Sequence, residues 1–344
     1  MDKRYLYVSG MFMPALLSVL DLAEASCSRF KLCRREILTL LMLMLLAGCQ
    51  QPSSIAPATQ RANEEMRTIA HAMGTSQVPF SPQRVVVLDT TPLDAALALG
   101  IQPVGTIRYG QPPSYLGEAA QTIKVVGQYN QPSLETILQL QPDLILGAKS
   151  ISEQLYPHLS RIAPTVFTEG AGQHWNWKNN FRLFAEALGR HEQAEQLIAE
   201  YEQRVVALKA SLESPRQNTT ASVLVISPRG IIAQTPRSFP GAVLQELGFA
   251  RNAIQGTTEQ FFVRLSREDL DAAEGDVLFL IHNAEWQMTS KADFVSDPLW
   301  SKLAVVQQGA VCEVPAEVWA TGRSILAATQ ILTDVERCTS QVPN

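Results

Sequence analysis

One pattern repeats along the chain from residue 82 onward: a short run of β-branched residues, then a turn, then a helical segment. The first run covers residues 84–88. The helix after it is predicted to begin with Thr91 as its capping residue and to end at Gly100. Strand-like runs recur at residues 103–107, 123–126 and 143–147, and residues 133–140 are helical. Parallel strands need a crossover between them, so this alternation predicts a parallel sheet with helices on both faces.

The pattern changes near residue 178, where helical periodicity replaces the strand-like runs. Residues 178–188 form one predicted helix, Gly189 interrupts it, and a long helix follows over residues 192–212. Apolar residues three or four positions apart form one stripe along this long helix, namely Leu197, Tyr201, Val205, Leu208 and Leu212. The long helix should therefore bury a single face.

A second series of strands and helices follows the long helix. Strands are expected at residues 222–227, 276–282 and 309–314, and helices at 241–247, from a capping-box pattern at 266–269 onward, and at 324–338. The fold class is therefore α/β: two Rossmann-like lobes with central parallel sheets, joined by one long rigid α-helix. The expected divisions are a removed signal and pre-segment (1–48), a lipidated flexible tether (49–81), an N-terminal lobe (82–177), a helical linker (178–213) and a C-terminal lobe (214–344).

The segment before the tether has the three parts of a bacterial lipoprotein signal. They are a basic stretch (Lys31, Arg34, Arg35), a short apolar run (residues 37–47) and small residues before a cysteine (Leu46-Ala47-Gly48-Cys49). We expect cleavage before Cys49 and acylation of its sulfur, with at least two acyl chains for stable anchoring. The apolar run would span only about 16 Å, against about 30 Å for a hydrocarbon core, so it is too short for a transmembrane helix.

The mature protein is thus expected to be exported and anchored to the membrane, on its periplasmic or outer-surface side. Residues 1–30 precede a complete signal, and we interpret them as the product of a misassigned translation start. Composition fits a globular chain, with 46% apolar and 18% charged residues. The net charge is −5 and no basic run follows the signal, which argues against a nucleic-acid partner.

The five cysteines divide by location. Cys27 and Cys33 fall in the removed segment and Cys49 takes the lipid, which leaves Cys312 and Cys338 in an oxidising compartment. Cys312 lies in a predicted strand and Cys338 ends the predicted last helix. A helix that returns antiparallel along its strand would bring the two together. A disulfide and a pair of buried free thiols both remain open.

Nine short motifs lie in a fixed order between about residue 82 and residue 338. They fall at residues 82–89, 99–105, 132–135, 140–146, 159–164, 243–248, 265–270, 297–300 and 314–319. In these motifs the chain resembles the iron-siderophore-binding lipoproteins of bacterial ABC importers, of the ferric hydroxamate or ferric dicitrate type. Each motif is weak alone, but their number, order and spacing are specific.

The resemblance implies a helical-backbone periplasmic binding protein fold. It also implies a monomer that captures a ferric siderophore or ferric citrate between its lobes and passes it to an ABC permease dimer with its ATPase. Glu135, in Pro-Ser-Leu-Glu, and Glu268, in Leu-Ser-Arg-Glu, match the acidic residue with which each lobe of the family meets permease arginines. The alternative for both is a solvated carboxylate in the first turn of a helix.

Open α/β sheets bind ligands beyond the carboxyl ends of their strands. The loops expected there supply the ligand-binding candidates Arg108, Tyr109, Tyr129, Lys149, Arg229, Arg237, Trp286 and Trp319, with Asp89, Thr90, Thr91, Asn130, Ser150, Phe262 and Arg323 nearby. Trp319 matches a tryptophan that lines the pocket in relatives. Guanidinium groups and aromatic walls suit an anionic chelate. Many relatives carry an arginine just before Pro-x-Leu-Glu, where this chain has Tyr129 and Asn130, so either another arginine supplies the charge or the ligand differs. Solvated surface charges are the alternative for Arg108, Arg229 and Arg237, and packing residues are the alternative for Tyr109, Tyr129 and Trp286.

Other classes of function receive less support from the residues. A haem or corrinoid ligand stays open, because Tyr109, Tyr129, His174 and His282 are candidate axial ligands. An exported enzyme is disfavoured, since the chain has no Gly-x-Ser-x-Gly, no His-Glu-x-x-His and no phosphate-binding glycine loop. A relative that only scaffolds other proteins is a further alternative. We expect no catalysis, no resident cofactor and no metal bound directly by side chains.

Overall fold

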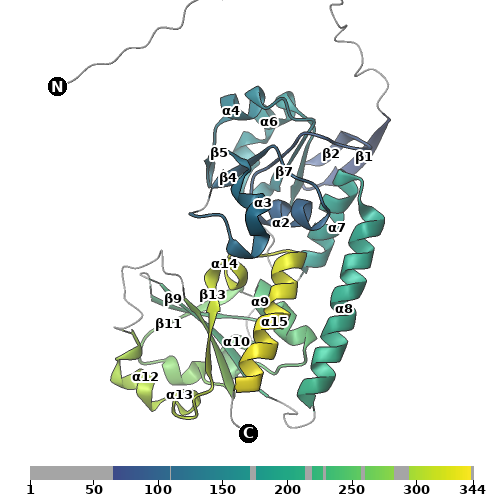
Figure 1. Cartoon of the computed structure of the whole chain (residues 1–344). Coiled ribbons are helices and arrows are strands. Elements are labelled where there is room, and N and C mark those ends of the chain that lie inside the picture. The colour runs from purple at the N-terminus through teal and green to yellow at the C-terminus, as the bar shows by residue number, and fades with distance from the viewer. Residues whose placement is uncertain are drawn as a thin grey trace, which may run out of the picture. The chain divides into compact units, whose positions relative to one another are not determined.

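The computed structural model describes residues 65–108, 110–170, 176–213, 219–227, 230–256, 260–282 and 294–341. The signal, Cys49 and residues 50–64 of the expected tether lie outside these ranges. Glu64–Asn344 form one compact unit. This unit contains an N-terminal lobe, a C-terminal lobe and the long helix α8 (His191–Glu213), which are visible in Figure 1.

The sheet of the N-terminal lobe has six strands in the order β6-β5-β4-β3-β7-β8. They are β3 (Val85–Val87), β4 (Gly105–Arg108), β5 (Lys124–Gln128), β6 (Gln131–Pro132), β7 (Leu144–Ala148) and β8 (Thr165–Thr168). All pair in parallel, as predicted, except the short edge strand β6, which is antiparallel to β5. Every residue of β3, β7 and β8 is buried, because helices cover both faces of the sheet.

The helices of this lobe include α2, whose start differs from the prediction. They are α2 (Thr90–Ala98), α3 (Gly117–Gln121), α4 (Leu134–Gln139), α5 (Lys149–Ser152) and α6 (Tyr156–Ile162), with 3-10 turns η2 (Ser114–Leu116) and η3 (Glu153–Leu155). The N-cap of α2 is Asp89 and not Thr91, because the Asp89 carboxylate accepts the N–H of Thr90 at 2.8 Å. The helix ends as predicted at Gly100, which has a φ of +70°.

An antiparallel hairpin precedes the N-terminal sheet, formed by β1 (Met66–His71) and β2 (Gly74–Pro79). It lies within residues 49–81, so the prediction that this whole range is a flexible tether is wrong for the hairpin. Only Ile69, Val78 and Pro79 are buried along it, which leaves little hydrophobic pattern to read. Polar bonds fix it in place: the Arg67 guanidinium donates to the carbonyl of Ala187, in the helical linker, at 3.0 Å, and the Ser76 hydroxyl donates to the carbonyl of Thr165, in the N-terminal lobe, at 2.9 Å.

Within the described residues, the sheet of the C-terminal lobe has five strands in the order β11-β10-β9-β12-β13. They are β9 (Ala221–Ser227), β10 (Gly230–Gln234), β11 (Phe262–Leu265), β12 (Val277–His282) and β13 (Val311–Pro315). Strands β9, β12 and β13 are parallel, but β10 and β11 are antiparallel to their neighbours. A wholly parallel sheet is therefore wrong for this lobe. Only two residues connect β9 to β10, and so short a connection can join only antiparallel strands.

One predicted helix of the C-terminal lobe does not form. The Ser266 hydroxyl donates to the Asp269 carboxylate at 2.7 Å, not to a helix backbone, and only the 3-10 turn η5 (Leu270–Ala273) follows. The helices of this lobe are α9 (Phe239–Glu246), α10 (Ala253–Gly256), α12 (Pro298–Lys302), α13 (Ala304–Gln307), α14 (Ala316–Trp319) and α15 (Ile325–Gln341). Gly248 closes α9 with a φ of +88°, as predicted.

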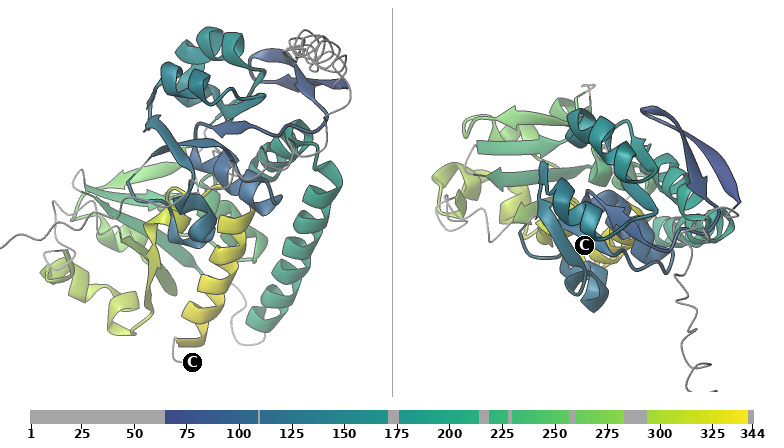
Figure 2. Two further views of the ribbon diagram at one scale, coloured as in Figure 1. Left: turned by 45° about the horizontal axis from the view of Figure 1, so that its top comes forward. Right: turned by 90° about the horizontal axis from the view of Figure 1, so that it is seen from above.

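Two helices link the lobes, α7 (Trp177–Leu188) and α8, and Gly189 separates them with a φ of +71°. The predicted stripe on α8 faces the core, since Tyr201, Val205 and Leu208 are buried. Helices α8 and α15 run side by side, as both Figure 1 and the left view of Figure 2 show. One cluster of buried apolar side chains continues from the N-terminal sheet through α2, α7 and α8 to α15 and the C-terminal sheet. The two lobes therefore share a core.

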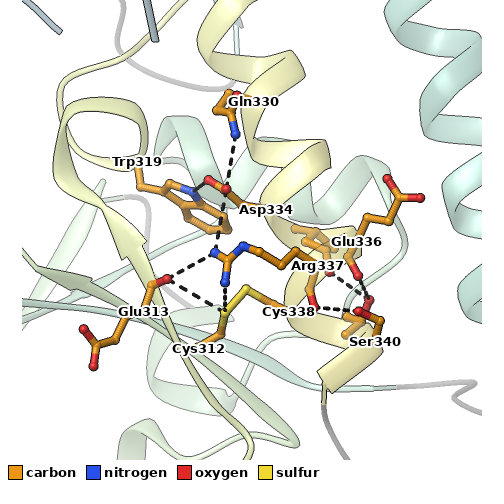
Figure 3. Close-up of a disulfide and its surroundings, with 11 residues drawn as sticks. Cys312, Glu313, Trp319, Gln330, Asp334, Glu336, Arg337, Cys338 and Ser340 are labelled. Carbon is orange, nitrogen blue, oxygen red and sulfur yellow. Dashed lines mark hydrogen bonds and ion pairs between the residues drawn. A yellow bond between two sulfur atoms is a disulfide. The ribbon is translucent and has the colours of Figure 1, made fainter. Parts of the chain in front are cut away.

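Cys312 on β13 and Cys338 on α15 form a disulfide, with their Cα atoms 5.7 Å apart (Figure 3). The last helix does return along its strand, which is the arrangement that makes this pairing feasible. The bond closes a segment of 26 residues, for which loop entropy gives a stabilisation of about 3–4 kcal/mol.

Candidate ligand site between the lobes

A pocket lies where the two lobes meet. Its lining residues are Asp89, Thr90 and Tyr129 from the N-terminal lobe and Thr321 and Arg323 from the C-terminal lobe. We call it the interlobe pocket. Asp89 comes soon after β3 and Tyr129 directly after β5, so the first wall is the carboxyl edge of a parallel sheet, where α/β proteins bind ligands. The second wall is the turn between α14 and α15, which follows β13.

The interlobe pocket brings a buried acid close to an arginine. Asp89 is 3% exposed, and burial raises the pKa of its carboxyl group. The positive charge of Arg323 and the N–H of Thr90 oppose that increase. The charged form of Asp89 is therefore less favoured than that of an exposed aspartate. The guanidinium of Arg323 also donates to the carbonyl of Ala320 at 3.4 Å, a bond within its own turn.

A second, more apolar pocket adjoins the first and shares Thr90 with it. Its lining includes Arg108 and Thr106 together with Leu93, Ile107, Gly110, Gln111, Pro112, Pro113, Ala120, Ile123 and Val125. The two pockets are connected through the backbone, because the N–H of Tyr129 donates to the carbonyl of Arg108 at 3.0 Å. The structure therefore brings Arg108, Tyr129 and Arg323, three residues named from the sequence, to one region.

Several polar contacts cross between the lobes beside this region. The Thr90 hydroxyl donates to the carbonyl of Thr321 at 2.9 Å, and the Ser114 hydroxyl donates to the carboxylate of Glu317. The carboxylate of Asp94, on α2, accepts the N–H groups of Leu326 and Ala327 at the start of α15, each at 3.0 Å. Asp94 is fully buried, and burial raises the pKa of its carboxyl group to about 7.

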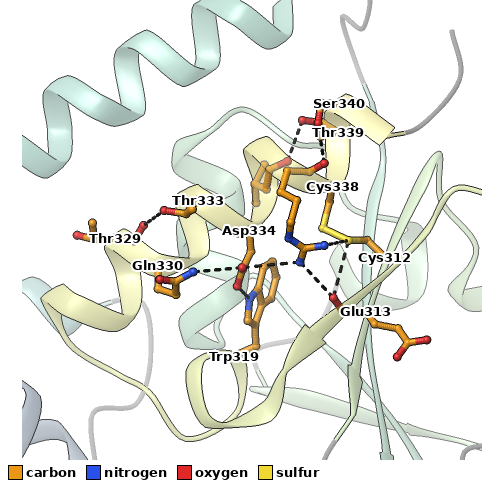
Figure 4. Close-up of polar contacts among 12 residues, drawn as sticks. Cys312, Glu313, Trp319, Thr329, Gln330, Thr333, Asp334, Cys338, Thr339 and Ser340 are labelled. Carbon is orange, nitrogen blue, oxygen red and sulfur yellow. Dashed lines mark hydrogen bonds and ion pairs between the residues drawn. A yellow bond between two sulfur atoms is a disulfide. The ribbon is translucent and has the colours of Figure 1, made fainter. Parts of the chain in front are cut away.

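Trp319 lies away from the interlobe pocket, so its assignment as a ligand contact is wrong for this structure. Its side chain is 1% exposed and stacks on Phe279 with ring centroids 4.8 Å apart. Its indole N–H donates to the buried carboxylate of Asp334 at 2.8 Å, as Figure 4 shows, and Asp334 also accepts from Gln330. Trp319 lies at the position along the chain that the motif predicts, but its ring packs in the core between β12 and α15.

Arg237 and Phe262 also lie away from the pocket, for a topological reason. Strand β10 runs antiparallel to β9, so the segment that follows it, which contains Arg237, starts at the opposite edge of the sheet. Phe262 pairs with Gln234 at that same edge. Both assignments assumed parallel strands and are wrong.

The remaining candidates divide between the surface and the residues that the structure leaves out. Lys149 is not among the residues that line either pocket, and its ammonium group pairs with Glu169 at 2.9 Å. Tyr109, Arg229, Trp286 and His174 lie outside the described residues, as does the side chain of His282. Glu135, in the first turn of α4, and Glu268, just before η5, are exposed on different lobes. Among the described residues, no three acidic, histidine or cysteine side chains form a group that could hold a metal ion.

Thr321 and Asp94 were not identified as site residues from the sequence. No motif or pattern in the sequence marks Thr321 as a site residue. Asp94 resembles an ordinary first-turn carboxylate, and its partners are 232 and 233 residues away.

A family model described as periplasmic binding protein matches residues 85–318, and the chain belongs to that family. One relative is the probable siderophore-binding lipoprotein YfiY of Bacillus subtilis, which is 36% identical over 311 residues, covering 86% of this chain and 94% of that protein. Another is the Fe(3+)-citrate-binding protein YfmC of Bacillus subtilis, which is 27% identical over 300 residues, covering 86% and 93%.

Among solved structures, the chain resembles Staphylococcus aureus SirA complexed with staphyloferrin B. The TM-score is 0.71 at 27% identity, and the match covers 80% of this chain and 98% of that one. Within the described part of the chain, no helix combines the length and the apolar character needed to cross a bilayer.

Proposed function

We propose that this protein binds an anionic ferric chelate, a ferric siderophore or ferric citrate, in the interlobe pocket and delivers it to an ABC permease. The observation that carries the proposal is the pocket itself: an arginine, two threonines, a tyrosine and the buried carboxyl group of Asp89 line it, between the carboxyl edge of the N-terminal sheet and the turn that follows α14. Names of relatives agree with this chemistry, since one is a probable siderophore-binding lipoprotein and another binds Fe(3+)-citrate.

The chemistry of the pocket suits a ligand rich in carboxylate groups. A guanidinium group binds carboxylates through paired hydrogen bonds, and the hydroxyls of Thr90 and Tyr129 can donate as well. Arg323 takes the role that an arginine before Pro-x-Leu-Glu plays in many relatives, with Arg108 in the adjoining pocket. The iron is cargo held by its chelator, so the protein needs no metal ligand and carries out no reaction.

The rest of the proposed uptake system is what the family resemblance implies. Glu135 and Glu268 each dock one lobe onto arginines of the permease dimer, so that the permease contacts both lobes at once. Such charge pairs fix the relative orientation of the two proteins more than they add to affinity. Cys49 holds the protein on the membrane through its acyl chains. The protein acts as a monomer.

Calorimetric titration of the purified full chain in detergent tests the proposal. Ferric citrate, ferric hydroxamates, hemin and cobalamin are titrated separately, and the bound ligand is recovered to check that it is unchanged. We expect reversible binding of at least one ferric chelate. Binding of hemin or cobalamin alone, or chemical conversion of the ligand, would refute the proposal.

The variant Arg323→Ala tests whether the interlobe pocket is the ligand site. Loss of a charge-assisted bond should weaken chelate binding about tenfold or more. Arg161→Ala, which removes an exposed arginine from α6, is the matched control and should bind as the wild type does. Equal affinities for the two variants would remove Arg323 from the site.

A further inference from the structure

The junction between α2 and α15 is built around one carboxylate. Asp94 lies on α2 and is fully buried. Its Oδ1 accepts the N–H of Leu326 and its Oδ2 the N–H of Ala327, both at 3.0 Å. These are the second and third residues of α15, whose first N–H groups have no partner within the helix. A residue of the N-terminal lobe therefore caps a helix of the C-terminal lobe.

A local cap is available but is not used. Ser324 directly precedes α15, where a serine hydroxyl ordinarily accepts an N–H of the first turn. The Ser324 hydroxyl is buried and accepts no such bond, and the N–H groups go to Asp94 instead. The helix start therefore depends on the position of α2.

Both walls of the interlobe pocket are attached to this junction. Thr90 lies one helical turn before Asp94 on α2, and Arg323 lies three residues before Leu326. The turn that carries Arg323 is packed tightly on the first turn of α15, since a Cβ atom added to Gly322 would lie 2.6 Å from the Cβ of Ala327. A movement of the first turn of α15 therefore moves Arg323 as well.

We propose that Asp94 is a positioning residue for ligand binding, which sets the distance between Arg323 and the Thr90–Tyr129 wall by capping α15 across the lobe interface. The inference rests on the proposed function, because it assigns a role within the same pocket. Asp94 itself is not among the residues that line the pocket. The role of Asp94 is to keep Arg323 at a fixed position opposite the Thr90–Tyr129 wall.

Ionisation of Asp94 should strengthen the cap, because a carboxylate accepts two N–H groups better than a neutral acid does. The side chains that act directly on the carboxyl group of Asp94 are Tyr115 from η2 and Ser324 from the turn before α15. Glu317 from α14 and Asp89, the N-cap of α2, act on Tyr115, and Arg323 acts on Asp89. Asp94→Asn keeps the shape of the side chain but not the charge. It resembles the protonated acid at every pH.

The test is the ratio of ferric citrate dissociation constants for Asp94→Asn and wild type, measured from about pH 5.5 to pH 8.5. The ratio cancels the titration of the ligand and of groups that both proteins share, Asp89 included. We expect a ratio near 1 at the acid end that rises to about 10 at the alkaline end. A general loss of structure would lower affinity at all pH values and give a flat ratio, which would overturn the inference.

Asp143→Asn is the matched control. The Asp143 carboxylate also accepts two backbone N–H groups, from Gln83 at 2.7 Å and Arg84 at 2.9 Å, but both lie in its own lobe. This variant should change affinity little and show no rise with pH. If both variants weaken binding alike, Asp94 has no special role in the pocket.

Hydrogen exchange measured by mass spectrometry supplies a readout without ligand. Asp94→Asn should raise exchange in residues 321–328 selectively, while strand β7 exchanges as in the wild type. If wild type binds no chelate, the proposed function fails and the exchange result alone decides the positioning role. Unchanged exchange at residues 321–328 would overturn the inference in either case.

Discussion

Burial raises the pKa of the Asp94 carboxyl group from 3.8 to about 7, so this pKa is close to neutral pH. The unfolded chain releases this proton near the lower value, and the folded protein only near the higher one. Between the two values folding takes up a proton, so the free energy of unfolding falls as the pH rises. The whole effect is on the order of 4 kcal/mol. Burial raises the pKa of Asp89 too and acts in the same direction.

The variant Asp94→Asn should therefore lose most of this pH dependence. Urea unfolding of wild type should show a decline in the free energy of unfolding, of which Asp94 accounts for about 3 kcal/mol between pH 5 and pH 8. The asparagine variant should lack that part, while Asp143→Asn keeps it. An equally steep decline in Asp94→Asn would show that the carboxyl group is not the source.

Single residues were predictable where local sequence decides their role. Gly100 and Gly189 end helices because they adopt positive φ, and the alternation of motifs placed Asp89, Tyr129 and Arg323 near a sheet edge. Trp319 was not predictable in this way, because a motif gives a position along the chain but not the direction of a ring. Asp94 could not be found either, since its partners come from the far end of the chain.

At the scale of elements, the turn between α14 and α15 is tightly packed. A Cβ atom at Gly322 would lie 2.6 Å from both the Cβ of Ala327 and the carbonyl oxygen of Val318. Gly322→Ala should therefore displace this turn and α15, and lower the free energy of unfolding by about 1–3 kcal/mol. Chelate affinity should fall as well, because Arg323 lies on the same turn.

Gly256→Ala is the control for that substitution. Its added Cβ would meet nothing closer than 3.8 Å, so stability and affinity should stay near wild type. Urea unfolding and calorimetric titration of both variants give the comparison. A Gly322→Ala protein as stable as the control would mean that the turn can adjust without disturbing its neighbours.

Elements with strong periodicity were predicted well, and weakly patterned ones were missed. The stripe of α8 and the buried runs of β3 and β7 carry clear signals in the sequence. The hairpin β1–β2 buries only Ile69, Val78 and Pro79 and is fixed by polar bonds that no pattern shows. Strands β10 and β11 were missed too, and with them the antiparallel edge that displaces Arg237 and Phe262 from the site.

For the whole molecule, the proposed docking role predicts that uptake requires both lobes to contact the permease at the same time. Glu135→Lys and Glu268→Lys should each reduce uptake of radioactive iron by about tenfold in cells that lack the wild-type protein, because a repulsive charge replaces an attractive one. Chelate affinity of the purified variants should not change. Glu200→Lys, an exposed charge reversal on α8, is the control. Normal uptake by both lobe variants would refute the docking role.

The continuous cluster of buried side chains through α2, α7, α8 and α15 bears on how cargo leaves the protein. Separating two lobes that share a hydrophobic core would expose apolar surface. We therefore expect the ligand to bind with little rearrangement of the lobes and to dissociate slowly. Under the proposed function, unloading would then require work done on the interface between the lobes, and ATP hydrolysis by the proposed importer would supply it.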